Sequence, residues 1–427
     1  MPIAPSPADE VLDVAGCGFG PANLALAIAL EEHGLRAARQ RFFERQDTLG
    51  WHRGMLLEGA TLQVSFLKDL VTMRNPTSGY SFVAYLHAVG RLPDFINGKT
   101  LYPLRMEYHD YLMWAAERLR APVAYGVEVT AIRPVVVDGL VEYLDVTART
   151  AGGVSAHRAR NVVIGTGLTP YLPQGVRESR RILHSERLLD HTPAIEAGRP
   201  RRLVVVGAGQ SAAEAVEHLH QRFPGAEVCA VFSRYGYSAA DDTPFTNRIF
   251  DPEAVDTIYG APEEVRESLL SYHRNTNYSV VDGDLARDLH RRFYQEKVLG
   301  RSRLRILNAA RVTHADEHEG GVRLSVEHLA TTETEILDAD AVVYATGYRP
   351  ADVTPLLGEL IADCKWDAHG RPRLERDYRL VTSDTVRCGI YLHGAGAEHT
   401  HGIGAGLLSN TAIRAGEIAR SLIGRLT

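Results

Sequence analysis

Cysteine is scarce in this chain. Four occur, at Cys17, Cys229, Cys364 and Cys388, and they lie far apart with no C-x-x-C pair. This spacing excludes a zinc knuckle and a dithiol redox centre, both of which need cysteines close together. The chain also lacks a run of about 20 uninterrupted apolar residues, the length that a membrane-spanning helix needs. Because no basic stretch precedes an apolar run at the N-terminus, we expect a cytoplasmic enzyme without a membrane partner.

The chain has no excess of positive charge. Lys and Arg number 47 against 53 Asp and Glu, which gives a net charge of −6 and disfavours nucleic acid as a partner. Hydrophobic residues make up 45% and charged residues 23%, which are ordinary values for a globular protein. At about 150 residues per domain, 427 residues predict two or three domains.

Glycine is plentiful where an apolar run near the N-terminus ends. The segment VLDVAGCGFGPANLALAIALEEHG reads as a strand, a tight turn and a helix closed by Gly34. A second strand ends at Glu44, at the distance expected for an acid that accepts hydrogen bonds from a ribose. A plain strand-to-helix turn is the alternative, but this context favours a dinucleotide site. Its turn residues are Gly16, Gly18, Gly20 and, in place of the usual last glycine, Pro21.

A second unit of the same kind begins at RRLVVVGAGQSAAEAVEHLH. Its turn residues are Gly207, Gly209, Gln210 and Ser211. We expect its second strand to end at Arg234, where the first unit has Glu44. An arginine can pair with a 2′-phosphate that a carboxylate would repel, so NADPH is favoured over NADH, although Arg234 could also be a solvated loop residue.

Two dinucleotide sites in one chain indicate hydride transfer from NADPH at the second site to FAD at the first. Without a C-x-x-C pair to accept the electrons, dioxygen is the leading acceptor. We therefore predict an α/β fold with two Rossmann-like domains and a small helical insertion that binds the substrate. The predicted ranges are 1–168 and 341–427 for the FAD domain, 169–242 and 300–340 for the NADPH domain, and 243–299 for the insertion.

Four further stretches carry a more specific signal. They are LQVSFLKDLVTMRNPTSGYSFVAYLHAVGRLPDFI at 62–96, NTNYSVVD at 275–282, ATGY at 345–348 and EHTHG at 398–402. Together with both glycine turns they resemble the L-ornithine N-monooxygenases of siderophore biosynthesis, over essentially the whole chain. The resemblance implies that NADPH reduces FAD, that dioxygen forms a flavin hydroperoxide, and that the δ-amine of L-ornithine is hydroxylated. The stretch MRNPTS, with Asn75, is similar to the ornithine branch.

The same resemblance implies roles for individual residues. Lys68 would pair with the substrate carboxylate, Asn247 and Asn277 would bind its polar backbone groups, and Ser409 would lie near its amine. Gln63 would lie near the flavin ring, so Gln63 and Asn277 are the expected catalytic residues. Further cofactor contacts are expected at Trp51, His52, Thr346, Gly347 and Leu408. Taken singly, such residues are usually surface, turn or cap residues.

Three further expectations concern a possible metal site, the length of the substrate and the oligomeric state. Glu398, His399 and His401 could suggest a metal, but we expect none and assign them a structural role beside the flavin. The stretch 403–406, Ile-Gly-Ala-Gly, departs from the family pattern, which makes substrate length less certain than reaction type. The family also implies a homo-oligomer, such as a tetramer.

Three alternatives stay open at this point. The first is the same N-hydroxylation on L-lysine or a related diamine. The second is an uncoupled flavoprotein of the NADPH oxidase type, which would release hydrogen peroxide. The third is a non-catalytic scaffold, which the two intact glycine turns disfavour.

Overall fold

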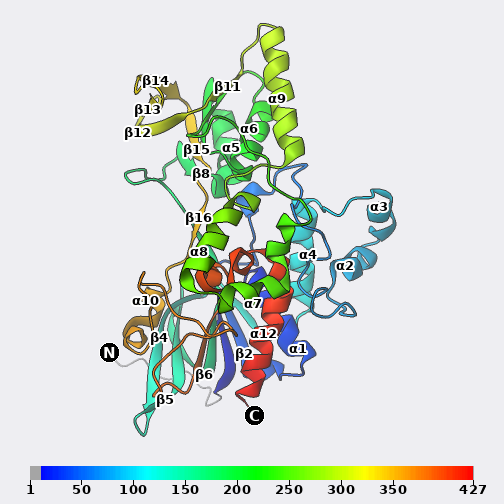
Figure 1. Cartoon of the computed structure of the whole chain (residues 1–427), viewed down its shortest axis with the longest axis vertical. Coiled ribbons are helices and arrows are strands. Elements are labelled where there is room, and N and C mark those ends of the chain that lie inside the picture. The colour runs from blue at the N-terminus through cyan, green and yellow to red at the C-terminus, as the bar shows by residue number, and fades with distance from the viewer. Residues whose placement is uncertain (1–10, 427) are drawn as a thin grey trace.

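Two separate parallel sheets organise the chain, as the computed structural model shows for residues 11–426 (Figure 1). The larger sheet has seven strands in the order β3-β2-β1-β6-β5-β4, with β17 paired to β6. Strands β3, β2, β1, β6 and β17 run parallel, and β4 and β5 extend the sheet as an antiparallel hairpin. Their bounds are Leu12–Cys17 (β1), Gln40–Glu44 (β2), Val123–Tyr125 (β3), Glu128–Val137 (β4), Leu140–Thr150 (β5), Gly153–Ile164 (β6) and Gly389–Leu392 (β17).

The smaller sheet repeats this parallel arrangement with five strands in the order β11-β10-β9-β15-β8. Its strands are almost continuous apolar runs because both faces are covered. Their bounds are Ile182–His184 (β8), Arg202–Val206 (β9), Glu227–Val231 (β10), Leu304–Leu307 (β11) and Ala341–Tyr344 (β15). Three antiparallel strands precede β15: Ala310–His318 (β12), Gly321–His328 (β13) and Thr334–Ala339 (β14). The two units are thus built alike, which confirms the predicted α/β class with two dinucleotide-binding folds.

Two short strands link the halves. Leu168–Pro170 (β7) and Tyr348–Pro350 (β16) each follow a Thr-Gly pair at the end of a buried strand, and they pair antiparallel with each other. The two similar T-G-x-x-P segments of the sequence are therefore the two crossings between the halves.

Each central glycine turn leads into a helix that packs on its own sheet. In the first half this helix, Pro21–Glu32 (α1), lies against the last helix, Thr411–Gly424 (α12), as Figure 1 shows at the C-terminal end. In the second half Gln210–Arg222 (α6) has the same position relative to β9. The other helices are Phe82–Ala88 (α2), Leu92–Asn97 (α3), Arg105–Arg118 (α4), Leu188–Ala197 (α5), Thr354–Leu357 (α10) and Glu398–His401 (α11).

The segment 243–299 is helical, but its helices pack in two places. Pro252–Gly260 (α7) contacts α11 and Glu263–Tyr272 (α8) contacts the single-turn helix His273–Thr276 (η5). In contrast, Gly283–Val298 (α9) packs on α6 and contributes Leu289 to the core of the second half. The last helix of the predicted insertion thus packs on the second half, beside α6 and β11 (Figure 1).

One predicted boundary is wrong. The second strand of the second unit ends at Val231, three residues before the predicted end at Arg234. The amide of Phe232 still donates to Leu307, but Ser233 is exposed and the chain leaves the sheet there. The predicted end of β2 at Glu44 is correct.

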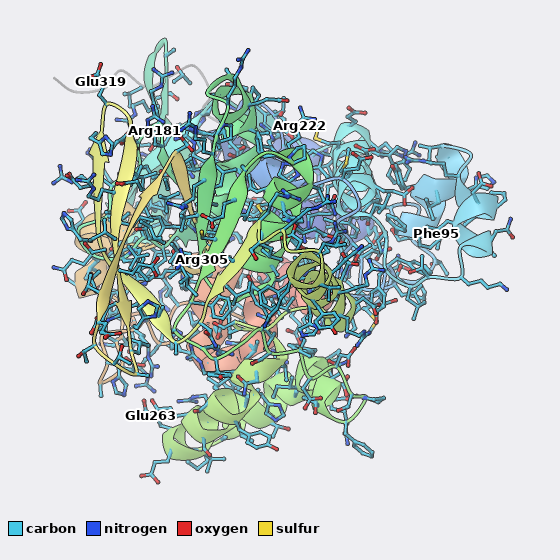
Figure 2. All side chains as sticks on the ribbon, turned by 90° about the horizontal axis from the view of Figure 1, so that it is seen from above. Phe95, Arg181, Arg222, Glu263, Arg305 and Glu319 are labelled. Carbon is cyan, nitrogen blue, oxygen red and sulfur yellow. The ribbon has the colours of Figure 1, made fainter. Side chains whose placement is uncertain are left out.

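Two projections flank the body of the molecule. The lobe of α2 and α3, marked by Phe95, and the β12–β14 sheet, marked by Glu319, lie on opposite sides in Figure 2. Within residues 11–426, none of the helices combines the length and apolar character needed to cross a membrane.

Candidate active site

A cleft of about 1570 Å³ lies where the carboxyl ends of the strands of both sheets face each other. Ligands bind at this edge of parallel sheets because the strand order reverses there and helix N-termini point into the opening. Most of the cofactor residues predicted from sequence line it, as do Gln63 and Asn277. The lining cofactor residues are Gly18, Gly20, Pro21, Glu44, Trp51, His52, Gly207, Gly209, Gln210, Ser211, Arg234, Thr346, Gly347 and Leu408. Gly16 does not line it, because it lies against the ring of Phe42.

The first glycine turn holds its shape through Gly18 and Glu44. Gly18 has φ +83°, and a side chain there would place its Cβ 2.5 Å from the carbonyl oxygen of Gly165. One carboxylate oxygen of Glu44 accepts from the Phe19 amide at 2.7 Å and the other from the Gln46 amide at 2.9 Å. Since each carboxylate oxygen can accept more than one hydrogen bond, Glu44 can fix the turn and still bind ribose hydroxyls.

The groups around this turn fit FAD. Helix α1 begins at Gly20 without a side-chain cap and without an acidic residue in its first turn, so its free amides and dipole face the cleft. His393, at the end of β17, is 2% exposed and lines the cleft. Its Nδ1 contacts Asn23 Oδ1 at 3.3 Å, whereas its Nε2 has no hydrogen-bond partner in the described part of the chain. A buried ring nitrogen without a partner indicates a site whose ligand completes it.

The second glycine turn also has a glycine with positive φ packed against a carbonyl oxygen, but the charged side chain near it is an arginine instead of a glutamate. Gly207 has φ +142°, and a Cβ there would lie 2.3 Å from the carbonyl oxygen of Ala345. Helix α6 also starts without a side-chain cap and without an acidic residue in its first turn. Arg234 lines the cleft and donates to the carbonyl oxygen of Ser279 at 2.9 Å, and Arg311 lines the cleft as well. Arg311 pairs with Glu327 at 2.7 Å, so Arg234 is the guanidinium here that better suits the extra phosphate of NADPH.

A buried ion pair that sequence reasoning missed connects the two halves. Arg105, at the start of α4, forms two hydrogen bonds with Glu214 of α6, at 2.9 and 2.7 Å. Gln210 donates to the same carboxylate at 2.9 Å and accepts from the Asp282 amide at 2.8 Å. The spacing of Gln210 and Glu214, four residues on one helix face, was a signal for part of this network. Nothing in the sequence pointed to Arg105.

The residues predicted to bind the substrate lie on several elements. Asn277 follows η5 and lines the cleft, whereas Lys68, Asn247 and Ser409 do not. Asn247 belongs to Thr246–Phe250 (η4), and Ser409 is buried in Leu408–Asn410 (η9). Helix η4 contacts η5 and also Ile403–Gly406 (η8), which contacts η9, so three of the four predicted residues come from neighbouring elements. Lys68 lies on a separate turn, next to the buried Asp69.

The loop of Lys68 is held by Asp69. The Asp69 carboxylate is 2% exposed and accepts from the amides of Val71, Thr72 and Phe82 at 2.9, 2.6 and 2.7 Å. Burial raises the pKa of this carboxyl, and these hydrogen bonds act in the opposite direction by favouring its charged form. The position of Lys68 therefore depends on a rigid turn tied to the start of α2.

Tyr278 and Glu398 form a hydrogen-bonded pair at the cleft that the sequence did not predict. The Tyr278 hydroxyl donates to Glu398 at 2.6 Å, and both residues line the cleft beside Asn277. Burial raises the pKa of Glu398, and the hydrogen bond from Tyr278 and the charge of Arg274 act in the opposite direction.

The histidines of EHTHG are engaged with backbone. His399 Nε2 contacts the carbonyl oxygen of Pro372 at 2.8 Å, and His401 Nε2 contacts that of Arg376 at 3.1 Å. His401 also stacks on Tyr378 with ring centroids 4.0 Å apart. These contacts agree with the structural role expected for this stretch.

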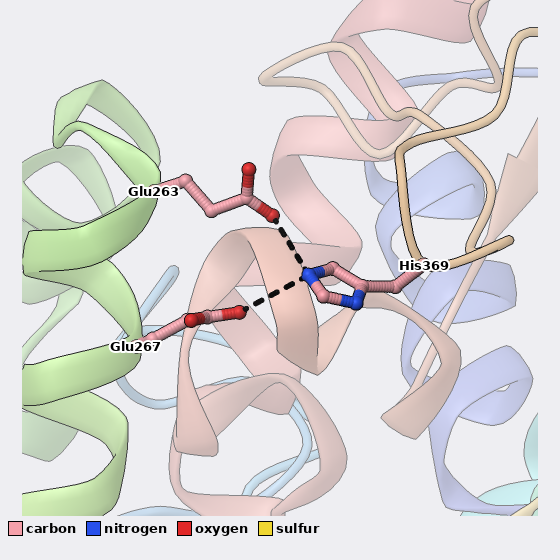
Figure 3. Close-up of side chains that lie close together, drawn as sticks. All are labelled: Glu263, Glu267 and His369. Carbon is pink, nitrogen blue, oxygen red and sulfur yellow. Dashed lines mark ion pairs between the residues drawn. The ribbon is translucent and has the colours of Figure 1, made fainter.

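One group of three residues with metal-ligand atoms does occur in the described chain. Glu263 and Glu267 of α8 approach His369, each with an oxygen 3.6 Å from its Nε2 (Figure 3). All three side chains are exposed, and Arg371 also pairs with Glu263 at 3.3 Å. A guanidinium so close to the carboxylate opposes a cation there, and the group acts as an ion-pair contact between α8 and the turn that carries His369 and Arg371.

The stretch 403–406, where the sequence predicted a departure from the pattern it resembles, is tightly packed. Ile403 and Ala405 are buried, and a Cβ on Gly404 would lie 2.5 Å from Asn410 Nδ2. The glycine therefore lets η8 approach η9, the element that carries Ser409.

Comparison with known proteins identifies the family. Residues 10–350 match the model of the family described as L-lysine 6-monooxygenase/L-ornithine 5-monooxygenase. The chain belongs to this family. The ornithine N-hydroxylase of Kutzneria sp. 744, solved with reduced FAD, NADP⁺ and L-ornithine, is 48% identical with a TM-score of 0.95, covering 98% of this chain and 100% of that one.

Other members of the L-lysine 6-monooxygenase/L-ornithine 5-monooxygenase family are similar over the same length. The L-ornithine N(5)-monooxygenase of Burkholderia cepacia is 41% identical over 403 residues, 92% of this chain and 90% of that protein. The L-lysine 6-monooxygenase of Pseudomonas syringae is 32% identical with a TM-score of 0.85, covering 97% of this chain and 100% of that one. These comparisons confirm the family that the sequence motifs predicted.

Proposed function

We propose that this chain is an FAD- and NADPH-dependent monooxygenase that hydroxylates the δ-amine of L-ornithine. L-Ornithine, dioxygen, NADPH and a proton would give N5-hydroxy-L-ornithine, NADP⁺ and water. The observation that carries the proposal is the single cleft lined by both glycine turns, with Glu44 on one side and Arg234 on the other. The 48% identity to an enzyme solved with L-ornithine, against 32% to a lysine monooxygenase, supports ornithine as the substrate.

Different residues would bind the two cofactors. Glu44 and the start of α1 would hold FAD, and the start of α6 with Arg234 would hold NADPH. Bound FAD supplies the electron transfer and oxygen activation that no amino-acid side chain provides. Gln63 and Asn277 line the same cleft, which supports the catalytic roles that we propose for them.

Substrate recognition is proposed for Lys68, Asn247, Asn277 and Ser409. Their elements would fix the α-amino and α-carboxylate groups, so that only the side chain enters the cleft. The reacting amine must be uncharged, although a free alkylammonium has a pKa of about 10.4. Burial beside the flavin would lower that value, because desolvation disfavours the charged ammonium.

Turnover with a panel of amines tests the proposal. The purified protein, loaded with FAD, would receive NADPH and oxygen with L-ornithine, L-lysine or putrescine, and the product would be identified by mass spectrometry. We expect a mass gain of one oxygen on L-ornithine, with one NADPH consumed per product. Faster product from L-lysine would overturn the substrate assignment. NADPH consumption matched by hydrogen peroxide, without hydroxylated product, would instead indicate the oxidase alternative.

The destination of the product and the assembly of the chain are proposed from the family. We propose that the hydroxylamine enters a siderophore or another hydroxamate and that the chain assembles as a homo-oligomer. Light scattering on the purified protein would measure its mass, and a monomer of 47.0 kDa would contradict the second point.

A further inference from the structure

One charged side chain in the cleft lacks a counter-charge. Arg414 lies on α12, is 2% exposed and lines the cleft together with Leu407, Leu408 and Thr411. Thr411 and Arg414 are three residues apart, so they share one face of the helix. Charged residues are almost never buried so completely unless they are paired.

The protein itself satisfies this guanidinium poorly. Nη1 donates to the carbonyl oxygen of Gly404 and Nη2 to Thr411 Oγ1, both at the long distance of 3.3 Å, and Nε has no partner. The nearby carboxylate of Glu417 is taken by Arg376, with which it forms two hydrogen bonds at 2.9 and 3.0 Å. No Asp or Glu within residues 11–426 forms an ion pair with Arg414. Burial lowers the pKa of Arg414 without making it neutral at physiological pH.

A buried cation without a protein partner indicates an anionic ligand, because the cost of desolvating the charge must be offset. FAD offers two anionic groups: its pyrophosphate and, in the reduced state, its flavin ring. The uncapped start of α1 already faces the place of the pyrophosphate, and Glu44 marks the adenosine end. With its adenosine end at Glu44, FAD would place its ring away from Glu44, on the side of Gln63 and Asn277.

Contacts link Arg414 to the insertion, where the ring end of FAD would lie. Arg414 bonds to η8, which contacts η4 of the insertion, and η4 contacts η5 just before Asn277. The start of α12 contributes positive potential of the same sign, since its first residue, Thr411, lines the cleft and its first turn holds no acidic residue. Two independent sources of positive potential thus meet where the ring would lie.

We propose that Arg414 is the charge partner of the reduced flavin ring and favours the reduced over the oxidised state of FAD. NADPH supplies the two electrons as a hydride and becomes NADP⁺, while Arg414 keeps its proton throughout. The ring gains negative charge on reduction, and Arg414 with the start of α12 stabilises that charge. The inference rests on the proposed function only in that FAD is bound, and it does not depend on the identity of the amine.

The test compares Arg414→Met, which removes the charge at similar length, with Arg414→Lys, which keeps a charge. Arg420→Met is the matched control, because Arg420 is exposed on the same helix. The ratio of reduced to oxidised FAD would be measured at equilibrium with a reference dye, without oxygen or amine, and the affinity for oxidised FAD by titration of apoprotein. We expect Arg414→Met to lower the ratio about tenfold, which is about 30 mV for a two-electron couple. Arg414→Lys should lower the ratio only about threefold, because it keeps a charge at shorter reach, and Arg420→Met should leave the ratio unchanged.

Each other result would overturn the proposal in a distinct way. Weaker binding of oxidised FAD with an unchanged ratio would assign Arg414 to the pyrophosphate. An unchanged ratio and affinity with a lower melting temperature would make Arg414 a structural residue. If Arg414→Met does not fold, Arg414→Lys carries the test alone: its shorter reach should lower the ratio about threefold, and an unchanged ratio would overturn the proposal. Failure of the wild-type protein to bind FAD would be a failure of the proposed function.

Discussion

The two halves of the molecule use the same backbone and opposite charges. In both, the central strand ends in a glycine turn packed against a backbone carbonyl of a neighbouring strand end, Gly165 in one and Ala345 in the other. In the first half the next strand ends in the buried carboxylate of Glu44, whereas in the second the chain leaves the sheet and presents Arg234. The shared backbone fits a pyrophosphate in each half, and we propose that the differing side chain determines which dinucleotide each half binds.

Breaking either glycine turn should produce the largest effects and separate the halves. In Gly18→Ala the new Cβ meets the Gly165 carbonyl oxygen in a backbone conformation with positive φ, so FAD binding should weaken at least about 100-fold. In Gly207→Ala the clash is with the Ala345 carbonyl oxygen, so the protein should stay yellow while NADPH no longer reduces it. Flavin absorbance and stopped-flow reduction measure the two outcomes.

Gly225→Ala is the control for both substitutions, because Gly225 is exposed and a Cβ there meets nothing within 4 Å. Loss of FAD in Gly207→Ala would contradict the independence of the two turns.

Removing the charge of Arg234 or of Glu44 should give the next largest effects. Arg234→Ala should raise the KM for NADPH about 10- to 100-fold and leave that for NADH nearly unchanged, since only NADPH carries the 2′-phosphate. Glu44→Gln should weaken FAD binding about tenfold without affecting NADPH, because a neutral amide is a weaker acceptor than a carboxylate. Steady-state kinetics with both nucleotides and FAD titration measure these effects. An equal rise of the KM for NADH would show that Arg234 acts on the shared part of the nucleotide.

Lys68 belongs to neither glycine turn, so its replacement tests whether substrate binding can be separated from cofactor binding. Lys68→Ala should raise the KM for L-ornithine about tenfold, as expected for the loss of a charge-assisted hydrogen bond, with the KM for NADPH unchanged. Lys99→Ala, at an exposed lysine of the neighbouring lobe, is the matched control. A defect confined to NADPH would refute the role proposed for Lys68.

Much of this architecture could be predicted because its signals are local. A buried strand, a glycine turn and a helix occupy consecutive residues, so both dinucleotide-binding folds and the end of β2 at Glu44 followed from the sequence. The end of β10 did not, because Phe232, Ser233 and Arg234 continue the strand pattern while the neighbouring strands stop pairing.

The contacts that complete the cleft could not be predicted because they join distant residues. The Arg105–Glu214 pair spans 109 positions and the Tyr278–Glu398 pair spans 120, and neither has a periodic signal. Arg414 had a signal that was overlooked: a charged residue on the apolar face of the last helix, three residues after Thr411. A charge on a buried face is a reason to ask what ligand it meets.

The smallest expected effect concerns the stability of the first half in acid. His401 is 1% exposed, and burial lowers its pKa to about 4. The unfolded chain binds a proton at this histidine near pH 6.5, before the folded chain does, so stability present above pH 6.5 is lost as the pH falls toward 4. The loss is at most about 1.4 kcal/mol per pH unit from this group. Urea unfolding of the FAD-bound protein at several pH values should show a flatter acid slope in His401→Asn, whereas His369→Asn, at an exposed histidine, should keep the wild-type slope. An unchanged slope in His401→Asn would mean that other groups govern acid unfolding of this half.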